Sequence, residues 1–139
     1  MKRTLIAAMA SLLDIEAGAG VLEIRITDIR AAEGSIMMQV VDSEAAFDDQ
    51  APAAAQLILP AREPDVALSI DALPPGDYAM RVFHDVDGNG ELDTNLVGMP
   101  AEPWGFSNDA SGSFGPPSWR DARFVLGADG AEQHIRLNH

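Results

Sequence analysis

Apolar and polar residues alternate with a period of two along most of this chain, the pattern of a β-strand with one buried face. In segment 21–29, Val-Leu-Glu-Ile-Arg-Ile-Thr-Asp-Ile, the alternation is nearly complete. Turn-forming residues separate six further segments of strand character, which are 34–41, 55–59, 65–70, 77–84, 121–126 and 132–138. Seven short strands predict an all-β fold, an antiparallel seven-stranded β-sandwich.

The same alternation assigns a core, because every second side chain of a strand lies on one face. The predicted core residues are Leu22, Ile24, Ile26, Met38, Val40, Leu57, Leu59, Tyr78, Met80, Val82, Phe124, Ile135 and Leu137. A register slip of one residue would exchange the two faces of a strand.

The stretch 85–120 shows no strand pattern, and structureless segments longer than about 12–15 residues in compact domains are usually functional or disordered. It contains Trp104, Phe106, Phe114 and Trp119, which argues against disorder. These aromatic residues either present a surface to an envelope protein or a carbohydrate, or form the core of the loop itself. The Gly and Pro residues around Phe106 and Phe114 favour a local core.

The loop begins with residues 84–94, His-Asp-Val-Asp-Gly-Asn-Gly-Glu-Leu-Asp-Thr, which have the spacing of an EF-hand-type calcium loop. Asp85, Asp87 and Asn89 stand at the first three ligand positions, and Gly90 at the sharp turn. Glu91 would offer its backbone carbonyl, and Asp93 follows at the next ligand position. Alternating oxygen ligands on a tight loop converge on one point, as a hard cation requires. The pattern predicts a divalent-cation site, with calcium as the ion.

The pattern departs from an EF-hand at its last ligand position, where Leu96 replaces the bidentate Glu. Asp93, Asn95 or Glu102 would then have to complete the ligand shell, or the site is weak. The alternative is a polar hairpin loop that binds nothing, because Asp, Asn and Gly are also typical of tight turns.

The first 19 residues resemble an export signal. Lys2 and Arg3 precede an apolar stretch at 4–13 that is too short to span a bilayer, and residues 17–19, Ala-Gly-Ala, fit a cleavage site. The alternative is a retained amphipathic helix, but residues 5–13 have no polar helical face. We therefore expect a signal peptide at 1–19, a single domain at 20–139, and a periplasmic or extracellular location.

The chain has a net charge of −13 and no Cys. Removing residues 1–19 takes away two basic and two acidic residues, so the charge is unchanged. Such a surface repels nucleic acid and anionic lipid and attracts divalent cations. The absence of Cys excludes disulfides, thiol catalysis and thiolate metal sites. The oligomeric state and the biological role stay open at this stage.

A catalytic interpretation would use His84 as a base with Ser107 as the nucleophile, or carboxylates of the loop as an acid and base pair. No nucleophile elbow surrounds Ser107, because Gly105-Phe-Ser-Asn-Asp109 lacks the second Gly. The sequence therefore favours a non-enzymatic structural or binding module, assigns no catalytic residue, and keeps a hydrolase as the alternative.

Four motifs follow one another along the chain: Leu-Pro-Pro-Gly-Asp-Tyr-Ala at 73–79, the His-Asp loop from Phe83, Gly-Phe-Ser-Asn at 105–108 and Gly-Pro-Pro-Ser-Trp at 115–119. In this order they resemble the bacterial domain-of-unknown-function family 2141. The resemblance extends from about Val21 to the end of the chain and implies an exported β-rich domain without an established activity. It also keeps Glu102 as a candidate ligand. The turn at 73–78 resembles one in transthyretin-like sandwiches, so we expect a transthyretin-like or immunoglobulin-like fold.

Overall fold

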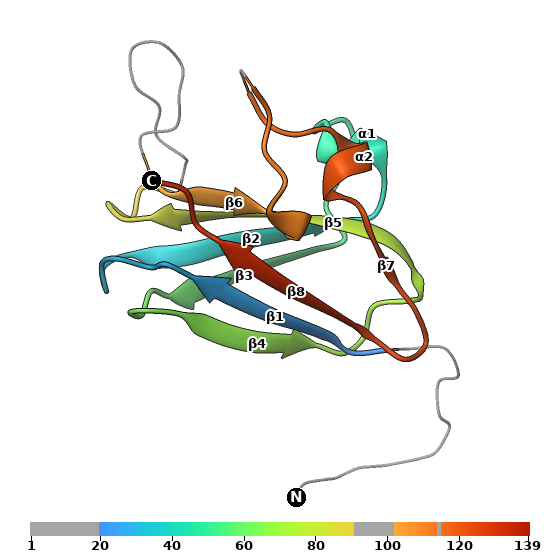
Figure 1. The fold of residues 1–139 in the computed structure, drawn as a ribbon, viewed down its shortest axis with the longest axis horizontal. Coiled ribbons are helices and arrows are strands. Elements are labelled where there is room, and N and C mark those ends of the chain that lie inside the picture. Colours follow the sequence, from blue (N-terminus) through green and yellow to red (C-terminus); the bar gives the residue numbers. More distant parts are fainter. Residues whose placement is uncertain (1–19, 91–101, 114) are drawn as a thin grey trace, which may run out of the picture.

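The computed structural model of the protein describes residues 20–90, 102–113 and 115–139, and these contain eight strands in two sheets (Figure 1). The strands are β1 (Leu22–Thr27), β2 (Ser35–Val41), β3 (Ala55–Pro60), β4 (Val66–Ile70), β5 (Gly76–Asp85), β6 (Trp104–Phe106), β7 (Phe124–Leu126) and β8 (Ala131–Arg136). The helices are α1 (Glu44–Phe47), η1 (Ser107–Asp109) and α2 (Trp119–Ala122). The predicted signal peptide lies outside the described residues.

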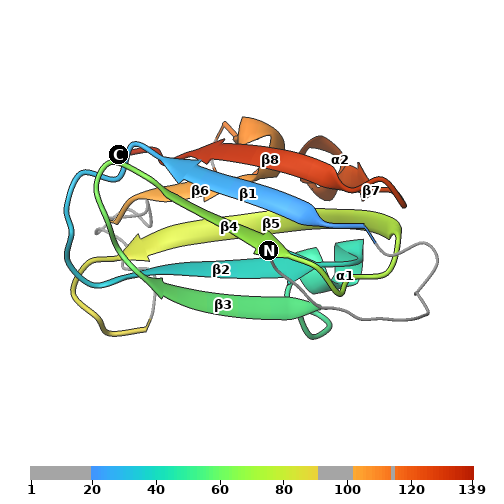
Figure 2. The same cartoon turned by 90° about the horizontal axis from the view of Figure 1, so that it is seen from below.

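The two sheets form separate layers (Figure 2). The smaller sheet has the order β4-β1-β8, and the larger has the order β3-β2-β5-β6, with β7 also paired to β5. Most neighbours are antiparallel, as the sequence predicts, but β1 and β8 are parallel. The prediction of an entirely antiparallel sheet was therefore wrong at this pair.

The sequence also missed β6, which lies inside the stretch 85–120 that we expected to lack strands. This strand has only three residues, Trp-Gly-Phe, and is too short to show alternation. The predicted strand at 121–126 begins later than expected, because α2 extends to Ala122 and leaves only β7. The Ser118 side chain caps α2 by accepting a hydrogen bond from the backbone N–H of Asp121.

A hydrophobic core with contributions from both sheets confirms the predicted faces. Of the predicted core residues, all but two are buried, and Leu57 and Leu59 are partly buried and pack against the others. β3 is an edge strand, which explains why its inward side chains keep some exposure. Among the described residues, no helix is long and apolar enough to cross a membrane.

A second, smaller cluster forms where α1 and α2 pack against the larger sheet. Its centre is Phe47, whose ring lies 5.9 Å from the ring of Phe106 and 6.1 Å from that of Trp119. Trp104 contacts Phe106 edge to face at 5.9 Å. Phe106 and Trp119 thus form part of a local core, as the Gly and Pro pattern favoured. Phe114 lies outside the described residues.

Candidate metal centre

The candidate metal centre lies at the end of β5, where strand alternation directs two neighbouring side chains to different environments. His84 is buried, with 1% of its surface exposed, and its Nε2 lies 2.6 Å from the backbone oxygen of Glu33. Its backbone N–H donates to the carbonyl of Pro103 at 2.9 Å. These bonds fix the strand end between two neighbouring segments, so Asp85 leaves the sheet in a defined direction.

After Asp85 the chain turns sharply around the carboxylate of that residue. Gly88 and Gly90 have φ of 72° and 82°, a region that favours glycine. The backbone N–H of Gly90 donates to Asp85 Oδ2 at 2.7 Å, and that of Asn89 donates to Asp85 Oδ1 at 3.2 Å. Asn89 N–H also donates to Asp87 Oδ1 at 3.2 Å. The spacing of Asp, Asn and Gly in the sequence is therefore what allows the turn to form.

Glu102 reaches the same turn from the segment that leads into β6. Its Oε2 accepts hydrogen bonds from the backbone N–H of Val86 at 2.9 Å and from that of Asp87 at 3.4 Å. The side chain is buried, with 8% exposed. Glu102 thus connects two parts of the chain that are far apart in sequence.

These contacts bring three carboxylates together. Asp85, Asp87 and Glu102 each offer one oxygen, and these oxygens all lie within 4.8 Å of one another. Two oxygens bound to one calcium at about 2.4 Å can be at most about 4.8 Å apart, so the spacing fits shared coordination. Asp85 and Glu102 are buried and Asp87 is exposed, which leaves the cluster open to solvent on one side. The arrangement can hold a hard divalent cation.

Of the other predicted ligands, the structure describes only Asn89 in the region of the turn. Asn89 lies in the same turn, where its backbone N–H bonds the carboxylates of Asp85 and Asp87. Glu91 and Asp93 lie outside the described residues. Sequence reasoning did not identify Gly34, which precedes β2 and lies directly against the backbone of Asp85. Gly34 has φ of 70°, and a Cβ there would lie 2.0 Å from the backbone oxygen of Asp85.

Ser107 and His84, the pair of the hydrolase alternative, are each engaged elsewhere. Ser107 is fully buried, and its Oγ accepts from the backbone N–H of Met80 at 2.9 Å and donates to the carbonyl of Ala122 at 2.6 Å. Its hydroxyl therefore joins β5 to the end of α2. These contacts favour a structural role for Ser107, as the bond to Glu33 does for His84.

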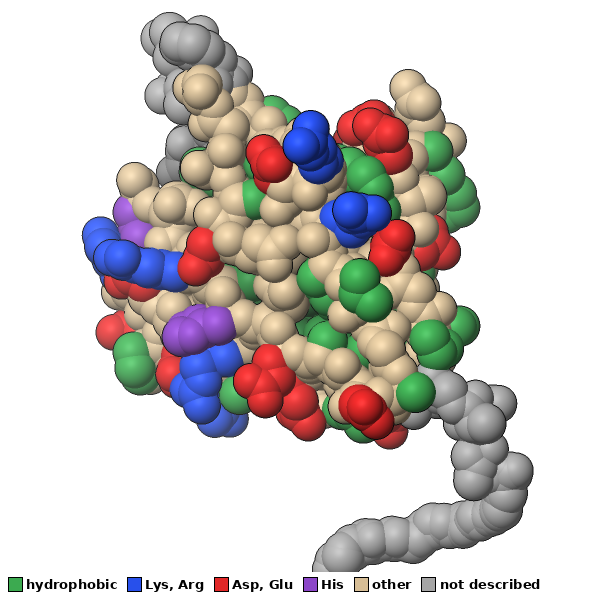
Figure 3. Space-filling view, turned by 45° about the vertical axis from the view of Figure 1, so that its right-hand side comes forward, with side chains coloured by type: hydrophobic (Ala, Val, Ile, Leu, Met, Phe, Trp, Pro, Cys, Tyr) green, Lys and Arg blue, Asp and Glu red, His purple; other side chains and the backbone are tan. Residues whose placement is uncertain are grey.

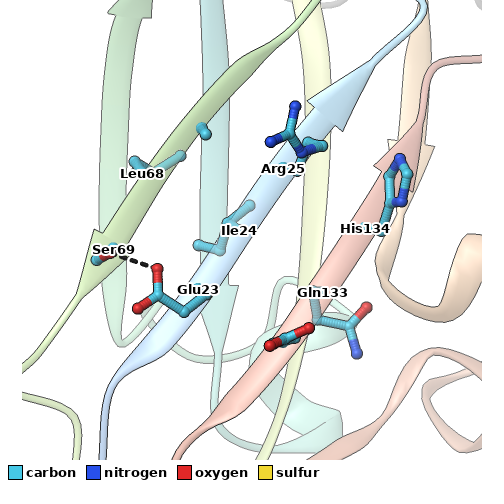
Figure 4. Close-up of a pocket in the computed structure, with 9 residues that line it drawn as sticks. Glu23, Ile24, Arg25, Leu68, Ser69, Gln133 and His134 are labelled. Atoms are coloured by element: carbon cyan, nitrogen blue, oxygen red, sulfur yellow. Dashed lines mark hydrogen bonds between the residues drawn. The ribbon is translucent and has the colours of Figure 1, made fainter.

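The outer face of the smaller sheet offers a different candidate, a shallow hollow of about 380 Å³. Its polar side chains carry both charges, and one of them, Glu23, accepts a hydrogen bond from Ser69 at 2.6 Å (Figure 4). Arg25 and His134 lie opposite each other in the register of β1 and β8. Arg25 is paired with Asp65. These groups do not converge on one point, so the hollow resembles an ordinary sheet surface.

Basic side chains gather near one end of this face (Figure 3). They include Arg30 and Arg136, which bond the carboxylate of Asp28 at 3.1 Å and 3.4 Å. The hydrogen bond from Arg30, together with the charges of Arg30 and His139 and the bond from Arg136, lowers the pKa of Asp28. This cluster is a surface ion-pair network in which one carboxylate already occupies the centre.

Fold and site together define a two-layer β domain with a three-carboxylate cluster at one end of its larger sheet. The chain belongs to the family DUF2141, described as an uncharacterized protein conserved in bacteria, whose model matches residues 24–135. The match runs from β1 to β8 and includes the acidic turn. No curated protein and no solved structure matches the chain.

Proposed function

We propose that this protein is an exported, non-enzymatic domain of the cell envelope that binds one calcium ion at the end of β5. The observation that carries the proposal is the convergence of Asp85, Asp87 and Glu102 within 4.8 Å. The first two come from a turn with EF-hand-like spacing, and the third comes from a distant segment. Glu102 supplies the carboxylate that Leu96 cannot offer at the last loop position.

Calcium suits this cluster better than magnesium does. Calcium accepts irregular geometry and 6–8 oxygens, whereas magnesium demands near-ideal octahedral coordination and keeps several waters. A site assembled from an irregular turn and one distant Glu has no evident octahedral frame. The net charge of −13 adds a long-range attraction for any divalent cation, but it does not select one.

Export is proposed from the basic start and the apolar stretch of residues 1–19, which give the domain a periplasmic or extracellular location. A domain without Cys cannot use disulfides there, so a bound ion would supply stability in their place. The two-layer architecture supports a transthyretin-like or immunoglobulin-like sandwich as the fold of the module. A structural or binding role fits these features, with hydrolysis as the weaker alternative.

Calorimetric titration of calcium into chelator-treated protein tests the proposal. We expect one ion per chain, and a weaker response to magnesium. Asp87→Asn should weaken binding at least tenfold, since it removes one charged ligand. Because Asp87 is exposed, this substitution should leave the fold intact, which circular dichroism would verify.

Asp48→Asn is the matched control, because Asp48 is an exposed acidic residue at the end of α1. Asp49 is unsuitable, because its carboxylate pairs with Arg81 at 2.6 Å. General attraction to an acidic surface would weaken equally in both variants, and high salt would suppress it. Equal effects of Asp87→Asn and Asp48→Asn would therefore exclude a specific site.

A further inference from the structure

The acidic turn after β5 contains a peptide unit that is chemically reactive. Of the four asparagines of the chain, only Asn89 is followed by a glycine. In an Asn-Gly pair the backbone nitrogen of the glycine can attack the side-chain carbonyl carbon of the asparagine, because no Cβ shields that nitrogen. Both residues are exposed, and a Cβ added at Gly90 would meet no atom of the described residues within 4 Å. Water therefore reaches this peptide unit.

The folded turn opposes the attack. The backbone N–H of Gly90 donates to Asp85 Oδ2 at 2.7 Å. The nitrogen must lose that proton before it can bond the side-chain carbon of Asn89, and a carboxylate beside it disfavours the amide anion that results. A hydrogen bond to a charged acceptor is also stronger than a neutral one. Cyclisation therefore requires that Asp85 first releases Gly90.

We propose that Asn89 is a deamidation site that the turn holds in check and that loss of the ion opens to reaction. A bond forms between the Gly90 nitrogen and Asn89 Cγ, the Cγ–Nδ2 bond breaks, and ammonia leaves with the proton of Gly90. Water then opens the cyclic imide at one of its two carbonyls and returns a proton to the nitrogen. One opening gives aspartate, and the other gives isoaspartate, in which the main chain runs through Cβ.

The two products change the ion site in opposite directions, and this step rests on the proposed calcium function. Aspartate adds a carboxylate at the third ligand position, and the number of charged ligands tunes calcium affinity. Isoaspartate adds one methylene to the main chain between the N–H groups of residues 89 and 90, which both donate to Asp85. That form cannot close the same turn, so it loses the site.

Bound calcium slows the reaction, because the ion keeps Asp85 and its turn in place. At free calcium about 100 times the dissociation constant, only about one hundredth of the protein is without the ion. Deamidation then becomes a record of time spent without calcium. The protection that comes from the Asp85 hydrogen bond alone does not depend on the ion.

The other two asparagines that the structure describes serve as internal controls. Asn108 Nδ2 donates to the carbonyl oxygens of Asp121 at 3.1 Å and Arg123 at 2.9 Å. Asn138 Nδ2 donates to the carbonyl of Trp104 at 3.1 Å. Each is followed by a residue with a side chain, so both should stay intact while Asn89 reacts.

The first test compares two Asn-Gly pairs of one turn in chelator. Asp87→Asn places a second such pair before Gly88, whose N–H donates to the backbone oxygen of Asp85 at 3.4 Å and not to its carboxylate. Gly88 matches Gly90 in exposure and in the space around an added Cβ. Tandem mass spectrometry after incubation in mildly alkaline buffer measures both positions, and the same protein in urea gives their intrinsic rates. Relative to those rates, we expect position 87 to react at least about tenfold faster than Asn89.

The second test follows the unsubstituted protein in chelator and in calcium. Asn89 should react measurably in chelator, more slowly than in urea, and at least about tenfold more slowly still in calcium. Equal corrected rates at positions 87 and 89, or no reaction of Asn89 in chelator, would overturn the proposal. If Asp87→Asn alters the circular dichroism spectrum, the rates of Asn89 in chelator and in urea decide, and equality of these two rates excludes protection by the turn.

The outcomes separate this inference from the calcium function. If calorimetry shows calcium binding and the rate at Asn89 does not fall in calcium, the inference fails and the ion site stands. If no calcium binds, the proposed function fails, and the comparison in chelator still decides whether Asp85 protects Asn89.

Discussion

Replacing Glu102 by Gln should change stability in opposite directions with and without calcium. The substitution keeps the shape of the side chain and one oxygen that can accept hydrogen bonds from the backbone N–H groups of Val86 and Asp87. It removes only the negative charge. In chelator that charge is repelled by Asp85 and Asp87, whereas in calcium it would be a ligand.

The magnitudes follow from the spacing of the cluster. Two unit charges within 4.8 Å of each other repel by about 3 kcal/mol or more at an effective dielectric constant of about 20. Because Asp87 is exposed, solvent and salt screen its charge, and its contribution to the repulsion of Glu102 is smaller. Exchanging charge-assisted for neutral hydrogen bonds costs about 1–2 kcal/mol. In chelator, Glu102→Gln should therefore raise the free energy of unfolding by about 1 kcal/mol, which is about 4 °C in Tm for a domain of this size.

In calcium the sign reverses. At free calcium about 100 times the dissociation constant, the ion stabilises the original protein by about 2.7 kcal/mol, and most of this is lost when a ligand charge is removed. Thermal melting in chelator and in calcium measures both effects. Glu102→Ala, which also removes the hydrogen-bond acceptor, should destabilise in both conditions. If Glu102→Gln lowers Tm by the same amount in chelator and in calcium, Glu102 is only a hydrogen-bonding residue and our reasoning fails.

Three further predictions concern the fold, and one of them also concerns the site. Ser107→Ala should lower the free energy of unfolding, measured with urea, by about 2 kcal/mol, because it leaves the buried N–H of Met80 without its acceptor. An unchanged urea midpoint would contradict this. Gly34→Ala should lower the free energy of unfolding by about 3 kcal/mol and weaken calcium binding, because Gly34 has a positive φ and its Cβ would clash with the backbone oxygen of Asp85. Ser35→Ala is the control. Burial, and secondly the charge of Asp42, raises the pKa of Tyr78, so the folded state retains the phenol proton. Stability should fall as pH rises above about 10, and Tyr78→Phe should flatten that fall in alkaline melts.

The sequence predicted the core well because alternation is a property of each strand alone. Leu22, Ile24 and Ile26 are spaced two residues apart, so the sequence of β1 alone shows that they share one face, whatever strand pairs with it. The pairing of strands depends on contacts between distant segments, so the parallel pair β1 and β8 could not be read from either segment. A three-residue strand such as β6 carries no period at all, and its backbone partners define it.

The candidate site was predictable to a similar extent. Asp85, Asp87 and Asn89 form a local pattern that tight turns and cation loops share. The approach of Glu102 results from its position just before β6, which the sequence pattern did not indicate. Gly34 is an ordinary turn residue until the structure shows the backbone oxygen of Asp85 beside it. Long-range convergence was thus the missing information in both the fold and the site.

The position of the three-carboxylate cluster has a structural consequence for β6. This strand is too short to be stable by its own pairing, and its start is fixed through side-chain and backbone contacts on both sides. Glu102 bonds the turn after β5, Pro103 accepts from the backbone of His84, and Trp104 exchanges backbone hydrogen bonds with Asn138. An ion shared by Glu102 and Asp85 would add a direct connection between β6 and β5. Calcium would then stabilise the short strand β6 through its connection to β5.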